Sequence, residues 1–232
     1  MKMTIEIWSD VMCPFCYLGK RKFENALSQF ADKDLIEIEW KSFQLNPGLV
    51  TNPGMSIDDY LSEHKGMSVE QVAQANKYIT QAGQAVGLEF HYDKVIVANT
   101  FRAQQLLKFA HAQGKQNEME ERLFKAFFTE GKNVDDLATL LLLAKEAGLD
   151  TLTLQEALEN DRYAAQVQAD IAEANRLGIH GVPYFIFNRK MAVNGAQESS
   201  VFLETLRKSF AGWIKDNPEI EPRPIKFSYK PD

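Results

Sequence analysis

The stretch TIEIWSDVMCPFCYLGK, residues 4–20, decides how this chain folds. Its first residues alternate apolar and polar side chains, which is typical of a β-strand, and a helical pattern follows over residues 17–30. Between the strand and the helix lie Cys13 and Cys16, the only two cysteines in 232 residues. Two cysteines at this spacing at the start of a helix indicate a redox-active dithiol, because the helix N-terminus stabilises a thiolate.

A second signal is the stretch GVPYFIF, residues 181–187, in which a proline leads into a short apolar strand. A dithiol of this kind needs such a partner segment. We expect the bond between Val182 and Pro183 to be cis and to face the dithiol, since X–Pro bonds adopt the cis form at a cost of only about 0.5–1 kcal/mol. The Val182 backbone would then pair with an extended thiol substrate, as in β-strand addition. The alternative is an ordinary proline at a strand entry.

The cysteine pair has two other interpretations, a buried reduced pair and half of a zinc site. A zinc site with four ligands needs two more donors. The chain has no further cysteine, and its histidines are scattered, at His64, His91, His111 and His180. We therefore expect no bound metal.

Composition argues against several classes of partner. The chain carries 26 basic and 32 acidic residues, a net charge of −6, so nothing favours nucleic acid or an anionic membrane surface. The longest apolar run, residues 137–144, is far shorter than the roughly 20 residues of a membrane span.

The N-terminus shows no signal-peptide pattern, and we expect a cytoplasmic protein. In a reducing compartment, a close cysteine pair is more often catalytic or metal-binding than a structural link.

Secondary-structure patterns divide the chain into three parts. Strand patterns over residues 4–9 and 35–43 flank the first helix, which predicts a β-α-β unit with parallel strands. Two further strand patterns, over residues 184–188 and 191–193, precede a last helix that begins at Ser199 or Ser200. The middle of the chain shows helical periods, several of them followed by glycine, and the expected helices span residues 57–65, 69–86, 99–113, 118–129, 134–147, 152–160 and 162–177.

The simplest account of these parts is a sheet domain interrupted by a block of helices. We expect a discontinuous domain formed by residues 1–46 and 163–232, and a helical insertion domain formed by residues 47–162. The proline-containing tail from about residue 216 is expected to be an extended arm.

Taken together, the motifs resemble the thioredoxin superfamily, in particular its DsbA branch and the cytoplasmic FrnE-type group within it. The match rests on residues 9–20 and 178–185 and on two shorter motifs, Asn99-Thr100 and Gly195-Ala196-Gln197. This group is related to 2-hydroxychromene-2-carboxylate isomerase and to the kappa-class glutathione transferases. The resemblance implies an α/β, thioredoxin-like fold with a large all-helical insertion, as in DsbA.

Two residues depart from the patterns of these relatives. Phe15 stands where the FrnE-type group commonly has tryptophan and where DsbA has histidine, so it offers the dithiol neither charge nor hydrogen bond. Cys13 stands where the isomerase and the kappa-class transferases have serine, so their glutathione chemistry does not transfer directly.

The dithiol chemistry assigns different roles to the two cysteines. Cys13, at the helix start, is expected to be the exposed nucleophile and to ionise at lower pH than a free cysteine. Cys16, one turn further along, is expected to be the shielded resolving thiol. Because Phe15 adds no charge, we expect a dithiol that is not strongly oxidising. Pro14 and Phe15, together with the Val182-Pro183 segment, are the expected substrate contacts.

Four polar residues remain open between a functional and a structural role. Gln197 would help to hold a carboxylate such as that of glutathione, or would simply begin the last helix. Asn99 would contact substrate or cap its helix, and His180 would approach the site or make a structural hydrogen bond in its turn. Asp10 would tune protons at the dithiol or end the first strand.

These observations predict a thiol–disulfide oxidoreductase that acts on a protein or on a glutathione-like small molecule. Its redox group would be the Cys13–Cys16 disulfide, with no tightly bound cofactor and with glutathione as an optional co-substrate. One alternative is a glutathione-dependent isomerase or transferase acting on a small aromatic or polyketide-like substrate. Another is a non-catalytic binding or chaperone module. A homodimer is compatible with the sequence, which leaves the substrate and the direction of electron flow open.

Overall fold

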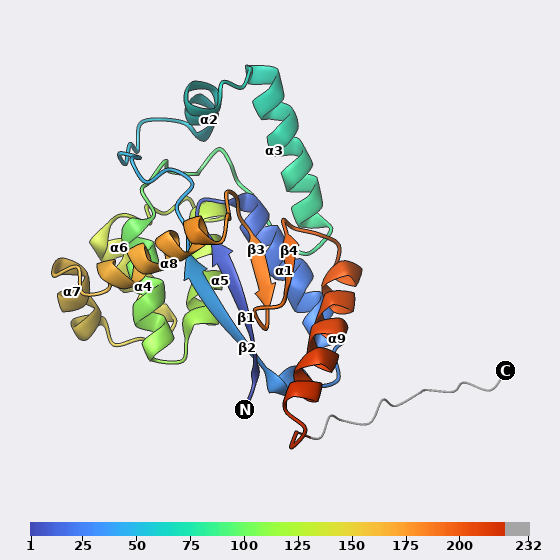
Figure 1. The fold of residues 1–232 in the computed structure, drawn as a ribbon. Coiled ribbons are helices and arrows are strands. Elements are labelled where there is room, and N and C mark those ends of the chain that lie inside the picture. The colour runs from blue at the N-terminus through green and yellow to red at the C-terminus, as the bar shows by residue number, and fades with distance from the viewer. Residues whose placement is uncertain (221–232) are drawn as a thin grey trace.

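A four-stranded sheet lies at the centre of the computed structural model, which describes residues 1–220 (Figure 1). The strand order is β2-β1-β3-β4, and β1 pairs with β2 in parallel and with β3 antiparallel. The parallel β-α-β unit predicted from the first 43 residues is therefore present. The strands are β1 (Met3–Ser9), β2 (Ile36–Ser42), β3 (Tyr184–Phe187) and β4 (Met191–Asn194).

Helices surround this sheet, and most of them lie between β2 and β3 in the sequence (Figure 1). Each predicted helix is present, with ends that differ by a few residues from the sequence estimate. The α-helices are α1 (Pro14–Ser28), α2 (Ile57–Lys65), α3 (Val69–Gln84), α4 (Phe101–Ala112), α5 (Gln116–Phe128), α6 (Leu137–Glu146), α7 (Thr151–Glu159), α8 (Ala164–Arg176) and α9 (Ser199–Asp216). The fold is thus an α/β, DsbA-like thioredoxin fold with a helical insertion, as predicted.

Glycines close several of these helices. Gly87, Gly114, Gly148 and Gly178 follow the ends of α3, α4, α6 and α8 with positive φ, the backbone conformation that favours glycine. The glycine that follows each of these helical stretches in the sequence therefore predicted correctly where the helix ends.

The face of the sheet toward α1 and α9 is apolar. Ile5 and Ile7 of β1 and Phe185 of β3 pack there against α1 and α9, and the rings of Phe185 and Phe202 lie 4.6 Å apart. Burial of aromatic and aliphatic side chains of this size stabilises a fold by roughly 1.5–3 kcal/mol each. This core fixes α1, and with it the cysteine pair, against the sheet.

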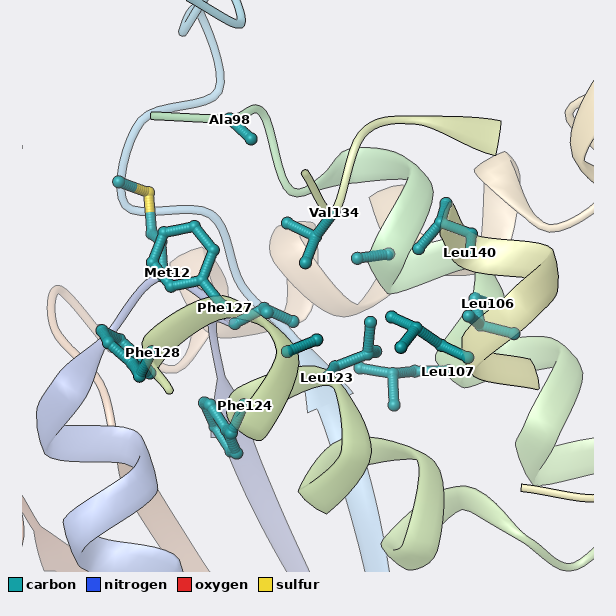
Figure 2. Packing of buried hydrophobic residues seen from close by; sticks show 14 of the residues in the cluster. Met12, Ala98, Leu106, Leu107, Leu123, Phe124, Phe127, Phe128, Val134 and Leu140 are labelled. Carbon is teal, nitrogen blue, oxygen red and sulfur yellow. The ribbon is translucent and has the colours of Figure 1, made fainter. Parts of the chain in front are cut away.

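A second core lies within the helical insertion and extends to the dithiol. Leu107, Leu123, Phe127 and Leu140 from α4, α5 and α6 form its interior, and Met12 from the turn before α1 joins the same cluster (Figure 2). The cluster also includes both cysteines. This core contains residues from both sides of residue 46, so it does not mark a domain boundary there. The domain boundaries expected at residues 46 and 163 stay a prediction.

The opposite face of the sheet is polar where α4, α5 and α8 cover it. Lys108 of α4 pairs with Asp170 of α8, and the Asp170 carboxylate also accepts a hydrogen bond of 2.8 Å from the Ser42 amide. The Trp8 indole donates to the Asp170 carbonyl at 3.2 Å. These contacts attach α8 to β1 and to the edge strand β2, and α4 to α8.

Two further observations concern segments that the sequence singled out. No helix within residues 1–220 has the length and apolarity that crossing a bilayer requires. Most of the predicted C-terminal arm lies outside the described residues, which end four residues after α9.

Candidate active site

The end of β1 and the start of α1 position the two cysteines. The chain leaves β1 at Ser9 and turns through residues 10–12, where the Cys13 amide donates to the Asp10 carbonyl at 2.9 Å. Cys13 is the N-cap of α1, and Pro14 occupies the first helical position. Proline is tolerated there because the first N–H groups of a helix lack intrahelical partners. Cys13 therefore lies at the positive end of α1, and Cys16 one turn inside it.

The Val182-Pro183 segment packs directly against the first turns of α1. Its peptide bond is cis, as predicted. The Cys13 thiol donates to the Val182 carbonyl, with 3.4 Å between sulfur and oxygen. On the other side, a Cβ atom placed on Gly19 would lie only 2.9 Å from Cγ of Pro183, so the absence of a side chain at Gly19 lets the proline ring approach α1. The structure thus brings together two segments that are 169 residues apart in sequence.

Burial differs from the prediction at one of the cysteines. Both are free thiols, and Cys16 is fully buried as predicted. Cys13 is only 3% exposed, so the prediction of an exposed nucleophile is wrong for this conformation. The reason is that Cys13 packs in the same apolar cluster as Val182 and Tyr92, from the cis-proline segment and the insertion. Phe15, at 42% exposure, is the accessible member of the motif, and Pro14 is half-buried.

Buried acidic groups lie behind Cys16. The Ser9 hydroxyl donates to Oε1 of Glu120 at 2.7 Å, and its polar influence on the neighbouring Cys16 thiol lowers the pKa of Cys16. Glu120 belongs to α5 and is 1% exposed, and its Oε2 atom has no partner among the described residues. Burial raises the pKa of Glu120 to about 7. A carboxyl group with this pKa can exchange a proton near neutral pH.

Asp10 is a second buried carboxyl group beside the dithiol. Its Oδ2 accepts a hydrogen bond of 2.7 Å from the Leu45 amide, which ties the loop after β2 to the cysteine turn. Burial raises the pKa of Asp10 to about 6, against the lowering effect of its hydrogen bonds. Burial also raises the pKa of the Cys16 thiol, and the neighbouring Cys13 raises it further. Cys16 therefore needs an acceptor for its proton before it can react.

One buried cation faces this acidic group. Lys20 on α1 is 2% exposed, pairs with Glu24 at 2.6 Å and Glu121 at 2.7 Å, and its charge opposes the rise in the pKa of Glu120. The carboxylate of Glu121 also accepts a hydrogen bond of 2.9 Å from the Tyr17 hydroxyl. The inner side of the dithiol is therefore a charged and hydrogen-bonded region with little access to solvent.

The remaining residues predicted from the sequence have structural contacts of their own. Asn99 accepts a hydrogen bond of 2.8 Å from the Phe101 amide and donates one of 2.8 Å to the Leu49 carbonyl, so it joins the start of α4 to the connection between β2 and α2. The exposed Gln197 side chain donates to the Asn194 carbonyl at 2.9 Å. His180 is exposed, two residues before the cis bond. A substrate role for these three residues stays a prediction.

Sequence reasoning missed Glu120, although a signal for it exists. Glu120 lies at helical spacing from Leu123, Phe124 and Phe127, so it occupies the apolar face of α5. A charged residue is seldom fully buried unless it is paired, so its position on an apolar face draws attention to it. Within residues 1–220, no group of three or more histidine, cysteine, aspartate or glutamate side chains could hold a metal ion.

Comparison with known proteins gives one family. The family model described as DSBA-like thioredoxin domain matches residues 4–207. The Bacillus subtilis protein YwbO, itself uncharacterised, is 32% identical over 204 residues, which cover 87% of this chain and 94% of YwbO. The crystal structure of a probable DsbA oxidoreductase from Streptomyces coelicolor superposes with a TM-score of 0.83 at 33% identity, covering 97% of this chain and 93% of that one.

More distant structures share the fold alone. The 2-hydroxychromene-2-carboxylate isomerase structure has a TM-score of 0.63 at 14% identity and covers 94% of this chain and 100% of its own. The cytosolic disulfide reductase DsbM from Pseudomonas aeruginosa, in a structure with GSH, has a TM-score of 0.60 at 16% identity with the same coverage.

Proposed function

This chain belongs to the DSBA-like thioredoxin domain family, and we propose that it exchanges disulfides through Cys13 and Cys16 opposite the cis Val182-Pro183 bond. Members of this family are thiol–disulfide oxidoreductases that act on thiol or disulfide substrates. The observation that carries the proposal is the position of the Cys13 sulfur, at the N-terminus of α1 and 3.4 Å from the Val182 carbonyl oxygen. A nucleophilic thiolate at a helix N-terminus beside a segment that can pair with substrate backbone is the arrangement that this chemistry requires.

The reaction proceeds in two displacements at sulfur. The Cys13 thiolate attacks a substrate disulfide, forms a mixed disulfide and releases one substrate sulfur as a thiolate. The Cys16 thiolate then attacks the Cys13 sulfur, which forms the Cys13–Cys16 disulfide and releases the second substrate thiolate. The cysteines lose two electrons, the substrate gains two, and the two cysteine protons pass to the two product thiolates. Run in reverse, the same steps oxidise a dithiol.

The inner side of the dithiol supports the second displacement. Cys16 is fully buried with a raised pKa, so its proton must be removed within the protein. The Ser9 hydroxyl interacts with Cys16 and donates to Glu120, so it can accept that proton on its oxygen while its own hydrogen passes to Glu120. Glu120, with a pKa of about 7, is the acceptor, and the proton later leaves to solvent or product.

Substrate and location follow from the same chemistry. We propose a cytoplasmic protein, because a chain whose two cysteines both belong to the dithiol suits a reducing compartment. The substrate is a protein disulfide or a glutathione-like small molecule, and no tightly bound cofactor is needed. The fold shared with DsbM in its GSH-bound structure supports glutathione as a candidate co-substrate.

Single-cysteine variants test the proposed function. Cys13→Ser should reduce the exchange rate with insulin or with 5,5′-dithiobis(2-nitrobenzoate) to background, because it removes the attacking sulfur. Cys16→Ser should still attack but accumulate the mixed disulfide, which mass spectrometry detects. Exchange by Cys13→Ser at the wild-type rate would refute the proposal.

The same variants separate the alternative function. A glutathione-dependent isomerase or transferase acting on a small aromatic or polyketide-like substrate needs no resolving thiol. Its activity would therefore persist in Cys16→Ser, whereas multiple-turnover disulfide exchange would not. The observation that favours this alternative is the fold that the chain shares with 2-hydroxychromene-2-carboxylate isomerase.

A further inference from the structure

The hydroxyl group of Tyr92 is buried and has no hydrogen-bond partner within residues 1–220. Tyr92 lies in the connection between α3 and α4, where its ring packs on Phe90 at 5.9 Å and on Phe128 at 6.4 Å between centroids. A buried hydroxyl without a partner is unfavourable, and native structures contain few of them. Phenylalanine would provide the same packing without this penalty, so the hydroxyl itself needs an explanation.

Ring contacts link Tyr92 to the first turn of α1 through two shared neighbours, Phe90 and Phe128. Phe90 and Phe128 also pack on Tyr17, at 5.9 and 6.3 Å, and the Tyr17 amide donates to the Cys13 carbonyl at 3.4 Å. Tyr92 packs against the apolar cluster that includes Cys13. Burial raises the pKa of Tyr92, and the negative charge of an ionised Cys13 raises it further. The hydroxyl is thus within electrostatic range of that sulfur and stays protonated, as a donor, at neutral pH.

Ionisation changes what Cys13 requires from its surroundings. As a thiol it donates to the Val182 carbonyl, but a thiolate has no proton to donate and then needs hydrogen-bond donors. The Cys16 thiol supplies one. The charged groups nearby do not, because Asp10 and Glu120 are acidic and Lys20 pairs with Glu24 and Glu121.

We propose that the Tyr92 hydroxyl donates a hydrogen bond to the Cys13 thiolate and is a further catalytic residue, supplied to the dithiol by the helical insertion. This inference deepens the proposed function and rests on it for the role of Cys13. The orphan hydroxyl would then gain its partner only when the sulfur is ionised. Hydrogen bonds that form with the charged state and not with the neutral state favour ionisation.

The test measures Cys13 ionisation in a chain with a single cysteine. Cys16→Ser leaves Cys13 as the only thiol, so the rate of iodoacetamide alkylation against pH reports on Cys13 alone. Adding Tyr92→Phe keeps the ring and removes only the hydroxyl. We expect the midpoint of the alkylation profile to rise by about one pH unit, and the rate below both midpoints to fall about tenfold.

Tyr17→Phe in the same Cys16→Ser background is the matched control. It removes a hydroxyl from the same aromatic group, but one that already donates to Glu121 at 2.9 Å, so the alkylation midpoint should not move. A midpoint for Tyr92→Phe within about 0.2 pH units of its parent, or an equal rise in Tyr17→Phe, would overturn the proposal. Thermal unfolding of Tyr92→Phe should match or exceed its parent, because an unpaired buried hydroxyl is lost. Since alkylation needs no disulfide substrate, its result can be read even if the wild type fails to exchange disulfides.

Discussion

The two sides of the dithiol differ in chemical character. The outer side, formed by Cys13, Phe15, Tyr92 and the Val182-Pro183 segment, presents aromatic rings, a carbonyl and a hydroxyl, all uncharged. The inner side, behind Cys16, is formed by Ser9, Asp10, Glu120 and Lys20, three of which are ionisable and buried.

This difference matches the two displacements. At the outer side a sulfur–sulfur bond is exchanged, which requires shape, a backbone to pair with and stabilisation of one thiolate. At the inner side a proton must leave a buried thiol, which requires groups that titrate near neutral pH. The insertion contributes to both, through Tyr92 outside and Glu120 inside. It therefore contributes chemistry to the dithiol in addition to covering it.

Removal of the inner carboxylate should have the largest effect. Glu120→Gln keeps the shape of the side chain but cannot accept a proton. Reaction with 5,5′-dithiobis(2-nitrobenzoate) releases one nitrothiobenzoate when Cys13 attacks and a second when Cys16 resolves, so stopped-flow absorbance follows both steps. We expect the second phase to slow about 100-fold at pH 8, with the first phase unchanged. In the wild type the second phase should accelerate as the pH rises through about 7, where Glu120 ionises, and the variant should lose this dependence.

Stability provides an independent measurement on the same variant. The pKa of Glu120 is about 7 in the fold against 4.5 for the free group, so the folded state holds the proton more tightly. Stability should therefore fall between pH 4.5 and 7 by about 3 kcal/mol through this group. Glu120→Gln should lack that loss and unfold at higher urea concentration at pH 8. Glu118→Gln, at an exposed position of the same helix, is the control. If the second phase had the same rate in Glu120→Gln and Glu118→Gln, the inner carboxylate would have no special role in the second displacement, and the proposed difference between the two sides of the dithiol would be wrong.

On the outer side, the close contact of Gly19 with Pro183 can be broken. Gly19→Ala places a methyl group 2.9 Å from Cγ of Pro183, which α1 and the cis-proline segment must relieve by moving apart. We expect a loss of about 1–2 kcal/mol in unfolding free energy and a roughly tenfold slower first phase, since a near-attack geometry tolerates little displacement. Gly212→Ala in α9 meets nothing within 4 Å and should gain about 1 kcal/mol from helix propensity. An equal gain in both variants would show that the contact with Pro183 is not tight.

The sequence predicted those parts of the site that depend on local pattern. The strand, the cysteine turn, the helix and the glycine-terminated helices each follow from neighbouring residues, whereas the cis bond at Pro183 is expected mostly from the resemblance to the DsbA branch. The burial of Cys13 and the placement of Tyr92 and Glu120 depend on how the insertion packs back on α1, which no local pattern encodes. For Glu120 alone, its position on the apolar face of α5 offered a clue.

The smallest expected effect concerns Phe15, the exposed residue between the cysteines. Phe15→His adds a positive charge on the outer side when the imidazole is protonated, which stabilises the Cys13 thiolate and hence the reduced form. We expect the reduction potential, measured by equilibration with glutathione at pH 6, to become more positive by about 30 mV, equivalent to about 1.4 kcal/mol. At pH 8 the shift should largely vanish, because an imidazole titrates near pH 6.5. Phe15→Leu retains an uncharged side chain and should keep the wild-type potential at both pH values. An equal shift of the reduction potential in Phe15→Leu would mean that the aromatic ring of Phe15, and not its lack of charge, sets the reduction potential of the dithiol.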